Sequence, residues 1–230
     1  MSSKNTMSGP QLQCRVIPVT RVRQNCSLIW CAATGSAAVV DPGPDLAPIL
    51  LAIDETGVDV ERILITHSHP DHAGGAAALS ETLGARIEGP HRDERPEMAR
   101  MLEYATQHDF RDCRLFEPAR WLRDGEEIAV GSCTIRAIHC PGHTAGHMAY
   151  FSPESRTAFV GDILFQGAIG ATSGPLNHLA LLRSIRLKLF PLGDDVSFVP
   201  GHGRLSFFGQ ERWVNPSVSD LAAEEYEHLL

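Results

Sequence analysis

The sequence lacks the features that would place it in a membrane or in an oxidising compartment. No apolar run approaches the ~18 residues of a membrane-spanning helix, and the polar residues 1–10 do not form the apolar segment of a secretion signal. The 6 cysteines are scattered without a Cys-x-x-Cys pair, which is typical of reduced thiols packed as small apolar side chains. We therefore expect a cytoplasmic protein without a membrane partner.

An excess of positive charge is also missing. The chain has 20 Lys and Arg against 28 Asp and Glu, a formal net charge of −8. A surface that binds nucleic acid or anionic lipid needs a basic face, so this balance argues against both partners. The Gly-x-Ser-x-Gly motif of serine hydrolases is absent as well. A hydrolytic activity would therefore need another source of its nucleophile.

The composition is that of a globular protein with a sizeable core. The chain has 230 residues, of which 43% are hydrophobic and 21% charged. We find no internal repeat, no low-complexity segment and no clear linker. The sequence thus predicts a disordered tail at residues 1–12 and a single domain over residues 13–230, closed by a short C-terminal helix within residues 217–230.

The most informative stretch is Thr66-His67-Ser68-His69-Pro70-Asp71-His72, with four potential metal ligands in six positions. A β-branched apolar run precedes it, and an Ala/Gly-rich segment that can start a helix follows it. This order predicts a strand, a tight loop and a helix. Three imidazoles and a carboxylate at the end of a strand favour a cation such as zinc over the alternative of a solvated, His-rich loop.

The rest of the chain alternates between strand-like and helix-like segments, which predicts a layered α/β fold. We expect strands at residues 13–19, 27–32, 37–40, 62–66, 85–88, 127–130, 134–138, 148–151, 158–160 and 196–199. Helices are expected at residues 46–56, 73–83, 97–108 and 176–189. The charged residues 91–117 indicate a lid or an insertion between two halves, and residues 124–126 indicate a hairpin turn.

After four predicted strands, His or Asp appears in the loop that follows. The residues that follow them are the cluster 67–72, His143, Asp162 and His202. Because sites in layered α/β folds form beyond the strand ends, the four loops are expected to assemble one cluster.

With these residues the chain resembles the metallo-β-lactamase superfamily, and within it the short branch of glyoxalase II-like hydrolases. The resemblance covers roughly residues 13–216, and its matching segments are Asp41-Pro42-Gly43, Thr66–Gly75, Pro141–His147, Gly161–Phe165 and Pro200–Gly203. It implies an α/β fold, a four-layer αβ/βα sandwich with metals at one edge.

The resemblance also implies roles for seven residues and two divalent metal ions. The first metal would be held by His67, His69 and His143, the second by Asp71, His72 and His202, and Asp162 would bridge the two. Zinc is favoured, with iron and manganese as alternatives. Asp71, His72 and Asp162 are the residues expected to serve catalysis most directly. Two cations roughly 3.5–4 Å apart acidify a bridging water, and the resulting hydroxide is the nucleophile.

The implied substrate is an acyl thioester, possibly derived from glutathione. A thiolate leaves easily because a free thiol has a pKa of about 8.5, so no strong general acid is needed. We find no obvious acid beside the ligands. The expected function is a dinuclear-metal hydrolase of S-lactoylglutathione or a related thioester. Alternatives are a mononuclear-iron persulfide dioxygenase, a lactonase or β-lactamase using the same metals, and a metal-stabilised binding protein.

The sequence departs from this family in two places. Full-length glyoxalase II has a C-terminal helical domain that helps to bind glutathione, whereas this chain ends shortly after Pro216. The short relatives usually have Gly-Arg-[Thr/Ser]-Asp where this chain has Gly170-Ala171-Thr172-Ser173. We therefore expect hydrolysis with an altered substrate preference.

Other residues near the motifs have open roles. His147 is expected to support a ligand rather than to bind metal, and Cys140 to pack in the core. His178 either starts a helix or reaches the pocket, and Asp41 either supports the metal loops or only forms a turn. Side chains that could line a pocket or bind a substrate carboxylate are Phe165, Lys188, Arg204, Phe207, Phe208, Arg212 and Trp213.

Overall fold

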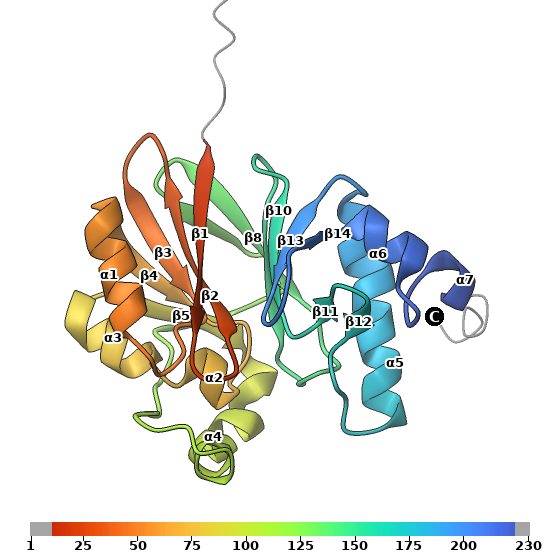
Figure 1. The fold of residues 1–230 in the computed structure, drawn as a ribbon, viewed down its shortest axis with the longest axis horizontal. Coiled ribbons are helices and arrows are strands. Elements are labelled where there is room, and N and C mark those ends of the chain that lie inside the picture. The colour runs from red at the N-terminus through yellow and green to blue at the C-terminus, as the bar shows by residue number, and fades with distance from the viewer. Residues whose placement is uncertain (1–10, 224–230) are drawn as a thin grey trace, which may run out of the picture.

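Two six-stranded sheets pack against each other, with helices on their outer faces (Figure 1). The computed structural model describes residues 11–223. The strand order is β1-β2-β3-β4-β5-β6 in the first sheet and β14-β13-β10-β9-β8-β7 in the second. This is the four-layer αβ/βα sandwich that the sequence predicts.

The first half of the chain builds the first sheet and its helices. Its strands are β1 (Leu12–Val19), β2 (Gln24–Cys31), β3 (Ser36–Val40), β4 (Asp59–Leu64), β5 (Arg86–His91) and β6 (Arg120–Leu122). Its helices are α1 (Ala47–Thr56), α2 (Pro70–Ala73), α3 (Ala76–Leu83) and α4 (Arg95–Gln107), the last preceded by a 3-10 turn, Arg92–Glu94.

The second half repeats the arrangement. Its strands are β7 (Glu127–Val130), β8 (Cys133–His139), β9 (Met148–Ser152), β10 (Thr157–Gly161), β13 (Ser197–Pro200) and β14 (Ser206–Phe207), with a small ribbon of β11 (Leu164–Phe165) and β12 (Ala168–Ile169). Its helices are α5 (Pro175–Arg183), a π-helical continuation Ser184–Leu189, a 3-10 turn Phe190–Leu192, α6 (Phe208–Val214) and α7 (Asp220–Ala223).

The inner strands β3, β9 and β10 read as nearly continuous apolar runs because both of their faces are buried. Along β2, Leu28 packs in the cluster between the first sheet and α1 and α3, whereas the next residue, Ile29, packs between the two sheets. Ile63 and Leu64 of β4 divide in the same way. A third cluster joins the second sheet to α5 and the π-helical turn through Leu181 and other apolar residues. Rigid strands on either side thus carry the loops of the candidate site.

Several expected boundaries differ in the structure. The expected helix 73–83 is divided into α2 and α3 at Gly74-Gly75. The chain passes so close to the loop after β3 there that a Cβ at Gly75 would collide with the backbone of Gly43. The hairpin prediction at residues 124–126 is wrong, since this turn joins β6 of the first sheet to β7 of the second. The expected helix 176–189 has α-helical geometry only to Arg183.

Residues 91–117 are an insertion within the first half, not between the halves, because they connect β5 to β6 of one sheet. Leu12 already belongs to β1, so the predicted tail is too long by at least one residue, and its residues 1–10 lie outside the described part of the chain. The predicted C-terminal helix contributes α7, and its residues 224–230 also lie outside. Within residues 11–223, every helix is too short or too polar to cross a bilayer.

Candidate metal centre

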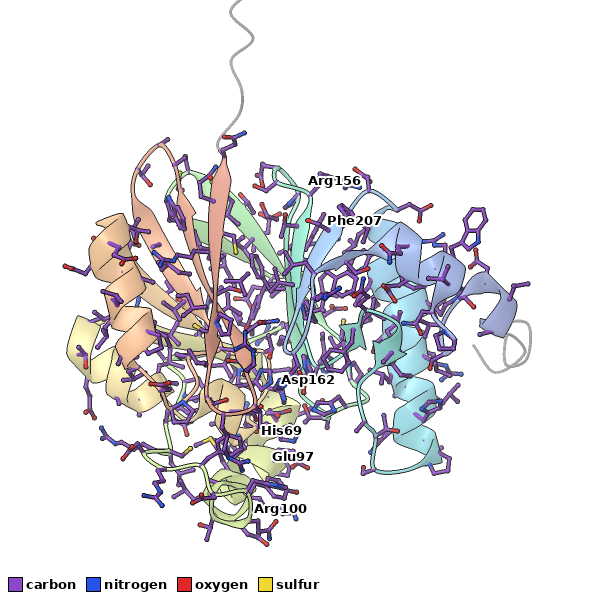
Figure 2. The ribbon with its side chains drawn as sticks, viewed as in Figure 1. His69, Glu97, Arg100, Arg156, Asp162 and Phe207 are labelled. Atoms are coloured by element: carbon purple, nitrogen blue, oxygen red, sulfur yellow. The ribbon has the colours of Figure 1, made fainter. Side chains whose placement is uncertain are left out.

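The loops that follow β4, β8, β10 and β13 meet at one edge of the two sheets. Figure 2 shows His69 and Asp162 at this edge and Phe207 at the opposite end of the molecule. Two sets of side chains at this edge each bring one potential ligand atom per residue to within 4.8 Å of the others and together contain the predicted residues. We call His67, His69, His143 and Asp162 the first group, and Asp71, His72 and His202 the second group. These are the seven residues predicted from the sequence.

Imidazole nitrogens converge in the first group. Nδ1 of His69 lies 3.1 Å from Nε2 of His67 and 3.1 Å from Nε2 of His143. Zinc–nitrogen bonds of about 2.0–2.1 Å place two ligands of a tetrahedral site roughly 3.3 Å apart, which is close to this spacing. The donor set therefore fits a divalent cation.

Asp162 lies between the two groups. Its Oδ2 is 3.7 Å from Nε2 of His143, and its Oδ1 is 3.3 Å from Nε2 of His72. In the second group, Nε2 of His202 lies 3.1 Å from Oδ2 of Asp71. Within the described chain, Nε2 of His72 and Oδ1 of Asp162 are buried without a hydrogen-bond partner. Such orphaned atoms are costly unless a ligand satisfies them, so they fit a cation shared through Asp162.

The imidazoles are oriented by partners on their other nitrogens. Nδ1 of His143 donates to the carbonyl of Ala171 at 2.7 Å, and Nδ1 of His202 lies 3.3 Å from the carbonyl of Val22. These contacts leave the opposite nitrogens free to bind metal. The segment that lacks the usual Arg and Asp therefore still supports a ligand, through the backbone of Ala171.

Asp41 anchors two further ligands, so it does more than form a turn. Its carboxylate accepts hydrogen bonds from the backbone N–H of Thr66 at 2.7 Å and from the Thr66 hydroxyl at 2.6 Å. It also lies 2.9 Å from Nδ1 of His72. Because the Thr66 hydroxyl donates to Asp41, it accepts from Nδ1 of His67 at 3.0 Å. One carboxylate thus orients His67 and His72 together.

The two groups differ in their electrostatics. Burial lowers the pKa of His67 and His69, the latter to about 4, and the neighbouring imidazoles act in the same direction. Burial would also lower the pKa of His72, but Asp162 and Asp71 raise it well above its usual value. The pKa of Asp162 is held low by His72 and His143 against the effect of burial. The first group thus presents His67 and His69 as neutral imidazoles beside the ionised carboxylate of Asp162.

His147 contacts the site without offering it a nitrogen. Its ring stacks on His67 with 4.5 Å between the centroids. Its Nδ1 lies 3.0 Å from the carbonyl of Met148, and its Nε2 accepts from the backbone N–H of Asp162 at 3.2 Å. Both nitrogens are therefore occupied, and the arrangement matches the prediction that His147 supports the ligands.

The glycine at position 201 lets two chain segments meet inside the site. A Cβ there would collide with the carboxylate of Asp162 and with the ring of His72. Only glycine permits this approach, which explains the glycine directly before His202 in structural terms.

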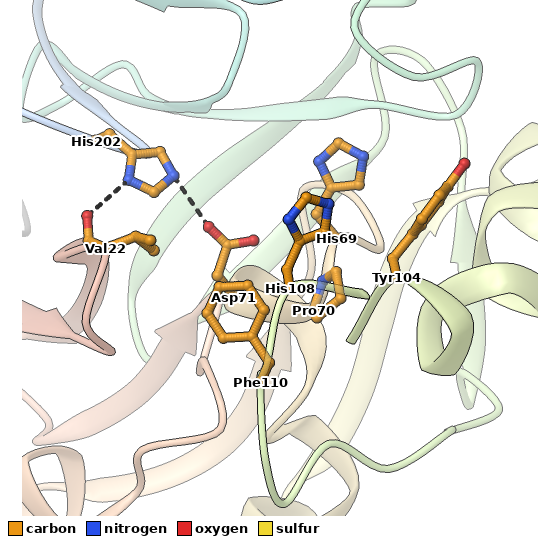
Figure 3. A pocket seen from close by; sticks show the side chains of 8 residues that line it. All are labelled: Val22, His69, Pro70, Asp71, Tyr104, His108, Phe110 and His202. Carbon is orange, nitrogen blue, oxygen red and sulfur yellow. Dashed lines mark hydrogen bonds and ion pairs between the residues drawn. The ribbon is translucent and has the colours of Figure 1, made fainter. Parts of the chain in front are cut away.

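A cavity of about 350 Å³ opens beside the two groups (Figure 3). It is lined by Val22, His69, Pro70, Asp71, Tyr104, His108, Phe110 and His202. Sequence reasoning missed the wall of this cavity, because Tyr104, His108 and Phe110 lie in the charged segment 91–117. Their position becomes evident only when α4 folds beside the metal loops.

Most of the other candidates lie elsewhere. Phe208 packs in the core against Phe198, and Cys140 is buried among apolar side chains, as predicted. The ring of Phe165 lies 6.4 Å from that of His202, near the site. His178 is exposed on α5. Side chains found at the surface or paired away from the cavity are Lys188, Arg204, Phe207, Arg212 and Trp213.

Comparison with known proteins identifies the family. The family model described as "Metallo-beta-lactamase superfamily" matches residues 19–202, a range that contains all seven residues of the two groups. The chain belongs to this superfamily. Family membership, fold and the clustered His and Asp residues together make it a metal-dependent hydrolase.

Individual members of the superfamily are similar over nearly the whole chain. "Hydroxyacylglutathione hydrolase GloC" of Haemophilus influenzae is 37% identical over 206 residues, which are 89% of this chain and 97% of that protein. The B3 metallo-beta-lactamase BLEG-1 superposes with a TM-score of 0.80 at 28% identity, over 89% of this chain and 98% of that one. TTHA1623, solved in a di-iron-bound form, superposes with a TM-score of 0.79 at 28% identity, over 89% and 100%.

Proposed function

We propose that this chain is a dinuclear-metal hydrolase that cleaves an acyl thioester such as S-lactoylglutathione. The observation that carries the proposal is the position of Asp162 between two groups of ligand atoms, with an orphaned oxygen facing an orphaned nitrogen of His72. The named activity of the Haemophilus relative supports the thioester as the substrate class.

In this proposal His67, His69 and His143 hold one cation, Asp71, His72 and His202 hold the other, and Asp162 contacts both. A pair of bound divalent cations supplies an acidified water as nucleophile and polarises the carbonyl that it attacks. The protein's own part is to keep the ligands in place. Asp41 and the carbonyls of Ala171 and Val22 hold imidazoles in the tautomer and orientation that a cation needs. Imidazole and carboxylate donors suit zinc, iron and manganese.

The cavity supports a small-molecule substrate whose reacting bond lies over the ligands. His69, Asp71 and His202 belong to its lining, and Val22, Phe110 and the ring of Tyr104 give it apolar walls. Among residues 11–223, its lining includes neither Lys nor Arg. A thiolate leaving group fits such a site, because it leaves without strong acid assistance.

Metal analysis combined with a substrate panel tests the proposal. Purified protein loaded with zinc should contain two metal ions per chain and hydrolyse S-lactoylglutathione or a simpler acyl thioester. A chelator should abolish turnover, and added metal should restore it. Asp162→Ala should lose both metal and turnover, whereas Asp195→Ala, at an exposed ion pair with Arg156, should keep both.

Other outcomes would redirect the proposal. Absence of thioester turnover in fully loaded protein would overturn it. Hydrolysis of a β-lactam or a lactone instead would keep the metals and replace the substrate, and the likeness to BLEG-1 justifies their inclusion. One iron per chain with oxygen consumption would indicate a persulfide dioxygenase.

A further inference from the structure

A fully buried carboxylate joins the loop after β4 to the loop after β8. Glu94, at the end of the 3-10 turn before α4, has an exposed fraction of 0%. Its Oε1 accepts hydrogen bonds from the backbone N–H and the hydroxyl of Ser68, both at 2.9 Å. Its Oε2 accepts from the hydroxyl of Thr144 at 2.7 Å and from the backbone N–H of Gly146 at 2.9 Å. Oε1 therefore binds the loop after β4, and Oε2 binds the loop after β8.

The bridged residues lie next to the ligands of the first group. Ser68 stands between His67 and His69, and Thr144 directly follows His143. The three imidazoles come from these two loops, and their nitrogens meet with spacings of 3.1 Å. The separation of the loops thus decides whether these nitrogens converge on a single point.

The 3-10 turn that carries Glu94 is packed tightly against the loop after β8. A Cβ at Gly146 would collide with the backbone nitrogen of Glu94, and the carbonyl of Gly146 accepts from the backbone N–H of His91 at 3.1 Å. The backbone of the turn and the backbone of the second loop are therefore in direct contact.

Burial of this carboxylate has a free-energy cost that its partners must offset. Burial raises the pKa of Glu94, and the donors from Thr144, Ser68 and Gly146 lower it. All four partners approach as donors, which suits a carboxylate and does not suit an amide. The second group has a different support, because Asp41 holds His72 and the carbonyl of Val22 lies beside His202.

We propose that Glu94 is a positioning residue for the first group: it sets the distance between two ligand loops and thereby the metal affinity of that group, leaving the second group unchanged. This inference rests on the proposed metal-binding function. With Glu94, the residues that shape the site extend to the start of α4, the helix that brings Tyr104 to the cavity wall.

Two substitutions of Glu94 separate the effect of side-chain length from the effect of charge. Glu94→Gln keeps the length but turns an NH2 group toward one pair of donors. Glu94→Asp keeps the charge but is one methylene shorter, so it cannot reach both loops. Both should weaken the first group. Glu103→Gln is the matched control, because Glu103 lies exposed on α4, the helix that follows Glu94, and pairs there with Arg100 and Gln107.

The measurement is the binding of Co²⁺ to metal-free protein. Visible absorption monitors the binding, and competition with a chelator gives the affinity. His202→Ala leaves the first group as the intact site, and His143→Ala leaves the second. In the H202A background, E94Q and E94D should lower Co²⁺ affinity about 10–100-fold and alter the absorption bands. In the H143A background, the same substitutions should leave affinity unchanged. E103Q should change neither.

If Glu94 had a merely structural role, its substitution would lower the unfolding temperature and would leave the Co²⁺ affinity unchanged or lower it equally in both backgrounds. Either of these affinity results overturns the proposal. If the Glu94 variants fail to fold, Ser68→Ala and Thr144→Val each remove one donor, and a several-fold loss confined to the first group is expected. Unchanged affinity in both of these variants also overturns it. Wild-type protein that binds no cation overturns the proposed function itself, whereas wild-type binding with unaffected variants overturns the role of Glu94 alone.

Discussion

The carboxylate of Asp41 lies 2.9 Å from Nδ1 of His72, and the opposite nitrogen of that ring is buried without a hydrogen-bond partner within residues 11–223. Asp41 has a φ of 52°, in the left-handed region that few residues other than glycine adopt. Its bonds to Thr66 and His72 hold this conformation. A strained backbone kept in place by hydrogen bonds to a candidate ligand is typical of a functional site.

Asp41→Asn should therefore weaken metal binding rather than abolish folding. The amide can present an N–H to Nδ1 of His72 and favour the wrong tautomer, so metal affinity should fall about 10–100-fold. Metal titration with kcat measured at saturating metal checks this. Asp45→Asn, at an exposed position nearby, is the control and should behave as wild type. Equal affinities for D41N and wild type would assign Asp41 to the turn alone.

His147→Phe should reduce stability while two cations remain bound. Phenylalanine can keep the stacking on His67 but cannot accept from the backbone N–H of Asp162. The lost bond leaves a buried donor unsatisfied, which costs about 1–3 kcal/mol in the free energy of unfolding. Denaturant unfolding and elemental analysis measure the two effects, with His178→Phe as the exposed control. Loss of one cation in H147F would make His147 a ligand.

Phe110→Ala should raise KM with little change in kcat. Phe110 lines the cavity, and the guanidinium of Arg21 packs over its ring at 5.3 Å from the centroid. Loss of apolar contact equivalent to two methylene groups weakens binding by about 1.6 kcal/mol, or roughly tenfold. Steady-state kinetics on the thioester found active tests this. Phe207→Ala, 51% exposed at the far end of the molecule, should change neither constant (Figure 2). A fall in kcat alone would argue against a role in uniform substrate binding.

The stability of the metal-free protein should depend on pH through His139. Burial lowers its pKa, and the stacked ring of His91 and the ammonium of Lys188 act in the same direction against a bond to the carbonyl of Ala145. Asp124 accepts from its backbone N–H. With the folded pKa depressed, the stabilising contribution is complete above about pH 6.5 and is lost as pH falls through the folded pKa.

Unfolding of wild type and His139→Gln between pH 8 and pH 5 isolates this contribution. The glutamine amide can still donate to Ala145, but it does not titrate. The free energy of unfolding of wild type should therefore fall more steeply than that of H139Q as the pH is lowered. Parallel curves would show that His139 titrates alike in the folded and unfolded chains.

The sequence predicted elements well where local signals are strong. Gly57 and Gly84 end α1 and α3 with φ values of 65° and 71°, as their positions indicate. The residues at 124–126 predict a hairpin that the structure does not form, because turn chemistry does not say which sheet the next strand joins. That choice depends on the burial of Leu122 and Ile128 in the layer between the sheets.

The sequence by itself determined the family, the four strand-end loops and the seven residues of the two groups, because these depend on local spacing and on the chemistry of imidazole and carboxylate. Only the tertiary structure decided that Asp41 supports His72, that Ala171 orients His143 through its carbonyl, and that Glu94 is buried. Because Glu94 lies in a charged segment, the sequence alone predicts a solvated side chain, and only the packing of the folded chain excludes water from it. The physical reason is that these relationships join segments far apart in the chain, and burial exists only after both sheets have come together.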